Sequence, residues 1–431
     1  MLRRRLNEGA HPAAVSFFRA TYCAAVAAVT LYELVGLPQR YEKFAQFWGP
    51  LPMFKALGLG LPSQSLVMAA GALLVVTLVL AAAGVFTRPA LWASVGLYLV
   101  FFGTTLGWMT QFPGSGRPSD HHTLHVWLLA LLALSPGVGA YRLGQRFAAE
   151  PGVSAPGWPL LAARAVLGIA YLGAAYTKLS DTGLRWANGY NLQTTFLGKY
   201  ATFPELEIAH WLGQHYAVCL VLSLATIGFE LGFVTILLWP RRHPARWAYV
   251  AVGLGFHLAT WLTMGIWQFL FSFCAAYLVF LEWPMREAHP LPDSVPAGTP
   301  AKAAAAVVAL FALGVLFRPM AWPLADFATY NRYQNWRDQF DITTCEHLEP
   351  DGSARPCFGT HARIGEQVSL HLEPPATPND AARAWLKQQD ARVPPQQRRM
   401  LIGKRVRIGV RWFPATDGVP TVKTEQFTLV R

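Results

Sequence analysis

Residues 65–86 read SLVMAAGALLVVTLVLAAAGVF, an apolar stretch that contains no Asp, Glu, Lys or Arg. The hydrocarbon core of a bilayer is about 30 Å thick, and a helix needs about 20 apolar residues to cross it. This stretch therefore predicts a transmembrane helix, and similar stretches recur along the chain. The composition agrees, because 14% of the residues are charged, whereas soluble domains have about 25%.

Along the whole chain, hydropathy and the flanking Pro, Gly and charged residues predict nine spanning helices. The first carries Arg19 and has no small-residue cleavage site after its basic start, so we expect it to be retained rather than removed as a signal peptide. The nine predicted spans are Ala13–Gly36, Ser65–Phe86, Pro89–Thr110, His122–Val138, Pro159–Leu179, Tyr216–Trp239, Ala245–Ile266, Gln268–Trp283 and Ala303–Trp322.

After Pro323 the sequence becomes more polar. Residues Arg405–Phe413 alternate between apolar and basic side chains, and Gln426–Arg431 is a further short strand pattern, so the two are predicted to pair as a hairpin. Residues Ala381–Asp390 are predicted to form a helix, with Asn379 as its cap. The predicted fold class is therefore an all-α polytopic membrane bundle of about nine helices in residues 1–323, followed by a small, mostly β extramembrane domain in residues 324–431.

Basic residues predict how the bundle is oriented. If the N-terminus is cytoplasmic, the basic loops fall on that side at every second connection, and an odd number of spans leaves the tail outside. Cys345 and Cys357 agree with this, because a disulfide between them suits an oxidising compartment. The net charge of +12 is spread over these loops and the tail, which argues against a nucleic-acid-binding groove. The basic loop residues are Arg88, Arg142, Arg146, Arg241, Arg242, Arg246 and Arg286.

Ionisable side chains inside predicted spans are costly, which makes each of them a candidate for function. Lys178 lies at the end of the fifth span. In the predicted topology, this end and the start of the fourth span both lie at the outer face of the membrane. His257 lies roughly 12 Å below that level at 1.5 Å per residue. Burial disfavours the charged ammonium form, so a partly buried lysine can accept a proton near neutral pH. An outward-opening pocket is geometrically possible, and the other candidates are His121, His122 and His125 at the start of the fourth span, Glu230 in the sixth, and the buried arginines Arg19 and Arg164.

Each candidate also has a structural interpretation. Lysines near a helix end commonly extend to the lipid head groups, histidines at the interface can be polar flanks, and His257 can simply pack through a hydrogen bond. Glu230 lies deeper and is predicted to pair with a buried arginine such as Arg164. His121 and His125 are spaced for a metal ion, but no cysteine or second histidine pair supports one, so no metal is predicted.

Several dispersed motifs resemble one family. Residues 174–179, AAYTKL, followed by 184–190, LRWANGY, resemble the lysine-leucine and tryptophan-x-x-glycine signature of vitamin K-dependent γ-carboxylases and of their bacterial relatives, the horizontally transferred transmembrane (HTTM) domain proteins. Residues 120–124, DHHTL, resemble the family's asparagine/histidine block, and Phe256-His257 its phenylalanine-histidine block. Arg19 and Phe229-Glu230-Leu231 also resemble the bacterial branch.

The resemblance implies a quinol-using enzyme of the carboxylase (carbon-carbon lyase) and quinol epoxidase type in a bacterial inner membrane. Lys178 would deprotonate vitamin K hydroquinone or menaquinol, and oxygen and carbon dioxide would be co-substrates for carboxylation of a peptidyl glutamate. His122 would orient the quinol or stabilise its oxyanion. The other implied quinol-site residues are His257, His121, His125, Tyr176 and Trp186.

Two departures from the family pattern concern the peptide substrate. The tail is far shorter than the outer region of the animal carboxylases, and Asp120-His121 stand where paired asparagines are expected. The resemblance therefore favours quinol chemistry over peptide carboxylation. Two further hypotheses stay open: a non-catalytic protein that binds a lipid or quinone, and a maturation factor whose tail recruits an exported protein.

Overall fold

The computed structural model describes residues 9–10, 12–45, 48–107, 120–136, 138–139, 155–239, 243–281, 299–317, 339–349, 351, 353–356, 368–371, 376–392, 404–412, 415–416, 419–420 and 423–430. The chain divides into two compact units, formed by residues 1–181 with 226–331 and by residues 182–225 with 332–431. The predicted domain boundary at Pro323 lies outside the described residues.

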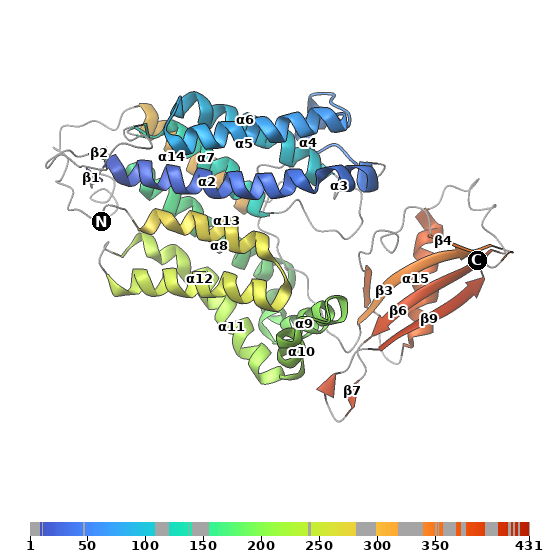
Figure 1. The fold of residues 1–431 in the computed structure, drawn as a ribbon. Coiled ribbons are helices and arrows are strands. Elements are labelled where there is room, and N and C mark those ends of the chain that lie inside the picture. The colour runs from blue at the N-terminus through green and yellow to red at the C-terminus, as the bar shows by residue number, and fades with distance from the viewer. Residues whose placement is uncertain are drawn as a thin grey trace. The chain divides into compact units, whose positions relative to one another are not determined.

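The first unit is a bundle of helices, shown in Figure 1. A two-residue ribbon of β1 (Gly9–Ala10) and β2 (Ala155–Pro156) precedes α2 and α8. The helix α11 (Tyr216–Phe233) belongs to both units, because the division falls at residue 225. The other helices of this unit are α2 (Pro12–Val35), α3 (Leu37–Phe44), α4 (Pro52–Ala56), α5 (Gln64–Ala83), α6 (Thr87–Gly107), α7 (Asp120–Leu134), α8 (Trp158–Thr182), α12 (Pro244–Met264), α13 (Trp267–Tyr277) and α14 (Thr299–Phe317), with 3-10 turns η3 (Val234–Leu237) and η4 (Leu278–Phe280).

Several contacts join helices that are close in the sequence, whereas α13 and α14 contact helices from the first half of the chain. Helix α2 packs on α5, α5 on α6, α6 on α7 and α7 on α14, while α13 contacts α2, α7 and α12. The approach of α5 to its neighbours depends on Gly71, because an added Cβ would lie 2.6 Å from the Phe101 ring and 2.8 Å from Leu34. Helix α13 therefore lies at the centre of the bundle, where it contacts helices from both halves of the sequence.

Within the part of the chain that the structure describes, six helices are long and apolar enough to cross a membrane. They are Ala13–Val35, Gln64–Ala83, Thr87–Gly107, Trp158–Ala187, Tyr216–Leu237 and Pro300–Phe317. Their outward faces are apolar, as the exposed Leu73 and Val76 of α5 and Val221 of α11 show, and contiguous apolar surface is uncommon on soluble monomers.

The remaining three predicted spans are not confirmed among the described residues. Helix α7 has 15 residues and α13 has 11, both shorter than the roughly 17 residues that a span needs at minimum. Helix α12 has 21 residues, but Arg246 and His257 within it reduce its hydropathy. The difference between six and nine therefore arises from short or polar central helices.

The second unit begins with a helical hairpin. The turn η2 (Gly183–Ala187) leads into α9 (Tyr190–Thr202) and α10 (Glu207–Gln214). Gly213 of α10 lies directly against Leu197 of α9, where an added Cβ would be 2.7 Å from the leucine side chain. A side chain larger than hydrogen at position 213 would therefore push the two helices apart.

The tail is a β-sheet with one helix on it. Strand β3 (Gln339–Leu348) pairs along one edge with β6 (Arg405–Trp412), which pairs with β9 (Lys423–Val430), and all these pairs are antiparallel. Strands β4 (Ala354–Pro356) and β5 (Val368–His371) pair with the two ends of β3, and β7 (Ala415–Thr416) with β8 (Val419–Pro420) forms a separate ribbon. The predicted hairpin of residues 405–413 and 426–431 is confirmed, with its second strand beginning at residue 423.

Helix α15 (Pro378–Arg392) covers one face of this sheet. Its Trp385 is buried with Ile342 of β3 and with Val406, Ile408 and Val410 of β6. These three β6 residues are the alternating apolar positions that predicted the strand, so the expected face of the sheet carries the tail's core.

Two details of the tail differ from or extend the predictions. The cap of α15 is Thr377 rather than Asn379, because the Asp380 N–H donates to Thr377 Oγ1 (3.2 Å) and Thr377 N–H donates back to the Asp380 carboxylate (2.9 Å). This reciprocal pair is a capping box, and Pro378 at the first helical position favours the same start. Cys345 is disulfide-bonded, and its predicted partner Cys357 lies outside the described residues.

Candidate functional site

Lys178 and Glu230 form an ion pair inside the bundle. Lys178 Nζ on α8 donates to both carboxylate oxygens of Glu230 on α11, at 2.7 and 3.0 Å, and to the Ala174 carbonyl at 3.4 Å. The two side chains are 5% and 4% exposed. A lysine that extends to the lipid head groups would have its ammonium at the surface, so the structure excludes that interpretation of Lys178.

A hydrogen-bonded group of His257 and two tyrosines lies on the same helix cluster. The Tyr171 hydroxyl of α8 bonds to His257 Nε2 of α12 at 2.5 Å and to the Tyr277 hydroxyl of α13 at 2.8 Å. Tyr171 precedes Lys178 by seven residues, which places both on one face of α8 about 10 Å apart along the axis. The ion pair and the His257 group therefore share one interior face.

Aromatic rings enclose the His257 group. The imidazole of His257 stacks on Phe273 with ring centroids 4.5 Å apart, and Tyr171 contacts Phe229 and Phe233 of α11 at 5.2 and 4.4 Å. His257 Nδ1 is buried without a hydrogen-bond partner. Such an orphaned polar atom is costly unless a water molecule or a ligand bonds to it, so this nitrogen is a candidate contact for a polar head group.

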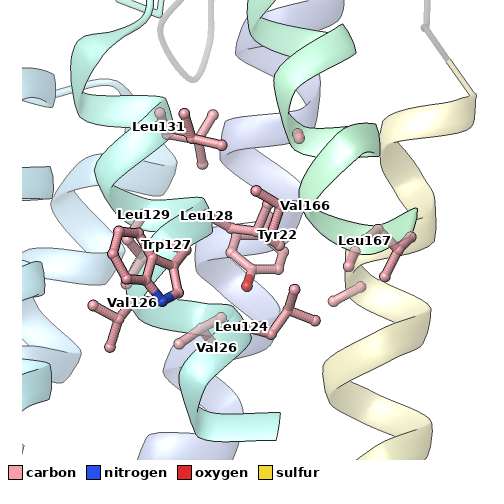
Figure 2. Close-up of a cluster of buried hydrophobic side chains, with 14 of the residues drawn as sticks. Tyr22, Val26, Leu124, Val126, Trp127, Leu128, Leu129, Leu131, Val166 and Leu167 are labelled. Atoms are coloured by element: carbon pink, nitrogen blue, oxygen red, sulfur yellow. The ribbon is translucent and has the colours of Figure 1, made fainter. Parts of the chain in front are cut away.

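The histidines of α7 make a second group. His122 Nδ1 bonds to the Tyr98 hydroxyl of α6 at 2.8 Å. His125 Nδ1 bonds to the Tyr22 hydroxyl of α2 at 2.6 Å, and its Nε2 bonds to Ser272 of α13 at 2.9 Å. Figure 2 shows Tyr22 lying between apolar side chains of α7 and α8. These histidines are therefore buried and hydrogen-bonded to neighbouring helices, and they are not solvent-exposed polar flanks.

The structure divides the predicted pocket into two groups. Ser272 on α13 belongs to the His125 group, whereas the next residue, Phe273, packs against His257. Among the described residues, no hydrogen bond or ring contact joins His122 to Lys178 or to His257. Lys178 and His257 thus share a helix cluster as expected, and His122 lies in the other group.

The predicted pairing of Glu230 with Arg164 is wrong. The Arg164 guanidinium donates to the Val279 carbonyl at 3.1 Å and lies over the Phe280 ring, while Glu230 pairs with Lys178. The prediction placed Glu230 deeper in the membrane than Lys178. The contact shows instead that residue 178, near the end of α8, is level with the second half of α11. Arg19 is buried as expected and donates to the Val138 carbonyl, in the turn after α7, and to the Ala82 carbonyl in the last turn of α5.

Three further predicted residues have different outcomes. Tyr176 is exposed, because residues two apart on a helix face nearly opposite sides, so it faces away from the Lys178 face. Trp186 is buried in η2, within the second unit. His121 lies in α7, but its side chain lies outside the described residues.

Sequence reasoning missed the hydroxyl partners: Tyr22, Tyr98, Tyr171, Tyr277 and Ser272. A signal for Tyr171 was present, since its seven-residue spacing from Lys178 fixes a common helix face. The others come from distant helices, and only the packing of α2, α6 and α13 brings them to the histidines. Spacing within one segment could not reveal them.

Comparisons with known proteins add no family. No family model, no curated protein and no solved structure matches the chain. Among the described residues there is no group of three or more His, Cys, Asp or Glu side chains arranged to hold a metal ion. What the site can do therefore follows from its own geometry.

Proposed function

We propose that the chain is a quinol-using protein of the vitamin K-dependent γ-carboxylase-like, HTTM type in a bacterial inner membrane. The observation that carries the proposal is the buried Lys178–Glu230 pair beside the His257 group. Buried ionisable groups in membrane helices are expensive, and they mark proton or substrate sites by default. In this proposal the pair provides the amine base, and the aromatic rings around the His257 group contact a lipid-soluble quinol.

The proposed roles follow from the geometry of each group. Lys178 is the base that takes a hydroquinone proton, and His257 Nδ1 bonds to a quinol oxygen. His122 and His125 hold α7 through Tyr98, Tyr22 and Ser272 and act as positioning residues. The proposed topology keeps the nine spans, with the N-terminus cytoplasmic and the tail outside; oxygen and carbon dioxide are the co-substrates of a coupled carboxylation.

An activity assay tests this function. The full-length protein in lipid nanodiscs is given reduced menaquinone or vitamin K with oxygen and bicarbonate, and quinone epoxide is measured. We expect product from the native protein and its loss in Lys178→Met/Glu230→Gln, which removes both charges together and so avoids a lone buried carboxylate. Lys302→Met, on the exposed surface of α14, is the matched control and should keep activity.

Two results would overturn the enzymatic proposal. The first is the absence of epoxide with every quinol supplied, and the second is equal activity in the native protein and the Lys178 variant. For the topology, a periplasmic reporter fused after Arg431 should be active, and an inactive reporter would contradict an outer tail.

A maturation role is the second candidate, and the tail favours it. The tail has its own apolar core around Trp385 and a disulfide at Cys345, as expected of a stable extracytoplasmic module that recruits an exported protein. Deleting residues 324–431 should then abolish the activity of a secreted client while quinol consumption by the bundle continues. Loss of quinol consumption alone would contradict this role.

A further inference from the structure

We propose that Glu230 is the proton acceptor that converts Lys178 into a base, so that the pair works as one proton-transfer unit. The inference rests on the proposed quinol chemistry and adds a second ionisable residue to it. It explains how Lys178, which is a charged ammonium in the ion pair, loses a proton and can then accept one from the quinol.

The hydrogen bonds of Lys178 show why it cannot act as a base while it is in the ion pair. An ammonium group has three N–H donors and no acceptor, and those of Lys178 face both oxygens of Glu230 and the Ala174 carbonyl. In this state the nitrogen has no lone pair for a quinol proton. Lys178 must first lose a proton, and a Glu230 oxygen lies 2.7 Å away, at the distance of a direct transfer.

Burial makes this transfer accessible. Moving one proton from Nζ to the carboxylate removes both charges at once, and therefore removes the desolvation penalty that each charge carries in a low-dielectric interior. An exposed pair in water has no such gain. With both side chains about 5% exposed or less, the neutral amine and carboxylic acid become a usable alternative to the ion pair.

The surroundings hold Glu230 in place. Its neighbour Phe229 and Phe233 one turn later pack on the Tyr171 ring, which fixes this face of α11 against α8. Among the described residues, Lys178 is the only charged side chain that bonds to Glu230. Other ionisable groups on the helices packed here include Tyr171 and Arg164 of α8, Tyr249, His257 and Arg246 of α12, and Tyr277 and Cys274 of α13.

The proposed cycle balances its protons. First a Lys178 Nζ–H bond breaks and a Glu230 O–H bond forms. Then a quinol O–H bond breaks and a new Nζ–H bond forms, which leaves a quinol anion beside the ammonium. When the product departs, Glu230 releases its proton to water and the ion pair is restored, so each turnover exports the one proton that the quinol gave up.

The test uses Glu230→Gln, which keeps the size and hydrogen bonding of the side chain but cannot take a proton, and Glu230→Asp, which keeps the carboxylate. In the first measurement, the full-length protein in nanodiscs is titrated with pH in the absence of quinol and followed by infrared difference spectroscopy. In the second, the rate of quinol consumption is measured as a function of pH. We expect a protonated-carboxyl band that shifts in Glu230→Asp and is absent in Glu230→Gln. The rate should fall about 100- to 10,000-fold in Glu230→Gln, as for loss of a general acid or base, with recovery and a native-shaped pH profile in Glu230→Asp.

Ser223→Ala, a buried polar change two turns earlier on α11, is the matched control and should leave both readouts unchanged. The proposal is overturned if Glu230→Gln keeps the native rate and pH profile, or if the native protein has no carboxyl band that responds to Glu230→Asp. The infrared titration needs no substrate. A native protein that shows the band but consumes no quinol therefore contradicts the proposed function while supporting the proton transfer.

Discussion

The bundle and the tail each contain an ion pair between neighbouring elements, and the two pairs differ in their surroundings. Lys178 and Glu230 meet inside the bundle, 5% and 4% exposed, with oxygens 2.7 and 3.0 Å from Nζ. Arg407 of β6 and Glu346 of β3 face each other across the tail sheet at 3.5 Å, 39% and 37% exposed. Both join oppositely charged side chains from adjacent elements, so burial is the main difference between them.

That difference determines what each pair contributes. Water screens an exposed pair, which is worth about 0–1 kcal/mol. A buried pair loses the hydration of both charges, and each partner then depends on the other for compensation. The charges of the buried pair therefore depend on each other, whereas those of the exposed tail pair can be changed with little effect.

Removing the charge of Lys178 alone should have the largest effect. Lys178→Met leaves the Glu230 carboxylate buried without its cation, and breaking a buried pair in this way costs about 3–5 kcal/mol. Thermal unfolding of the full-length protein in detergent measures the loss. The double variant Lys178→Met/Glu230→Leu removes both charges and should recover most of the stability. Equal stability of the single variant and the native protein would show that this interior is hydrated.

The sequence predicted which residues of the bundle are chemically unusual better than it predicted their partners. Hydropathy identified the apolar helices, and the cost of ionisable groups in them singled out Lys178, His257, His122 and Glu230. Pairing depends on the level and rotation of one helix against another, which no local pattern contains. Glu230 was therefore assigned to Arg164, although a 2.7 Å contact joins it to Lys178.

In the tail, by contrast, the sequence predicted correctly which two segments pair. Its strand pattern in residues 405–413 is a local alternation, and the predicted hairpin with the last strand was confirmed. The sequence did not reveal β3 to β5: β4 and β5 are short, and β3 has a register shift between Ile342 and Thr344. The cap of α15 was misplaced by two residues because Asn379 and Thr377 are both good cap residues, and only the reciprocal bond with Asp380 distinguishes them.

A second prediction concerns the packing that holds the His257 group. An added Cβ at Gly253 on α12 would lie 1.8 Å from the Tyr277 hydroxyl, so Gly253→Ala must displace this tyrosine from Tyr171. Overpacking of this kind costs about 1–3 kcal/mol, which unfolding in detergent measures. Gly255→Ala is the matched control, since nothing lies within 4 Å of its added Cβ. A similar loss in both variants would mean that the helix backbone rather than Tyr277 is affected.

The third prediction concerns the exposed pair. Replacing Glu346 by Gln should cost about 0.2–1 kcal/mol, as measured for exposed pairs, and high salt should reduce the difference. A double-mutant cycle with Arg407→Gln isolates the coupling free energy of the pair. Chemical unfolding of the tail is monitored by tryptophan fluorescence. A coupling free energy as large as that of Lys178 and Glu230 would contradict the prediction, because burial would then not explain the difference between the two pairs.

The smallest effect is expected at Asp380, a fully exposed carboxylate. The Thr377 hydroxyl and N–H donate to it at 2.6 and 2.9 Å, and these bonds hold the pKa of Asp380 below its usual value, which is about 3.9. A carboxylate whose pKa is lowered on folding stabilises the folded state above its unfolded pKa. That contribution is lost as the pH falls below about 4 and through the folded pKa. Amide hydrogen exchange of residues 378–385, expressed as protection factors, should show lower protection in Asp380→Asn than in the native chain at pH 7, and a shrinking difference towards pH 3. Thr377→Val removes the hydroxyl donor and should reproduce part of the loss at pH 7. A difference that stays constant with pH would mean that Asp380 acts on the helix through its shape rather than through its charge.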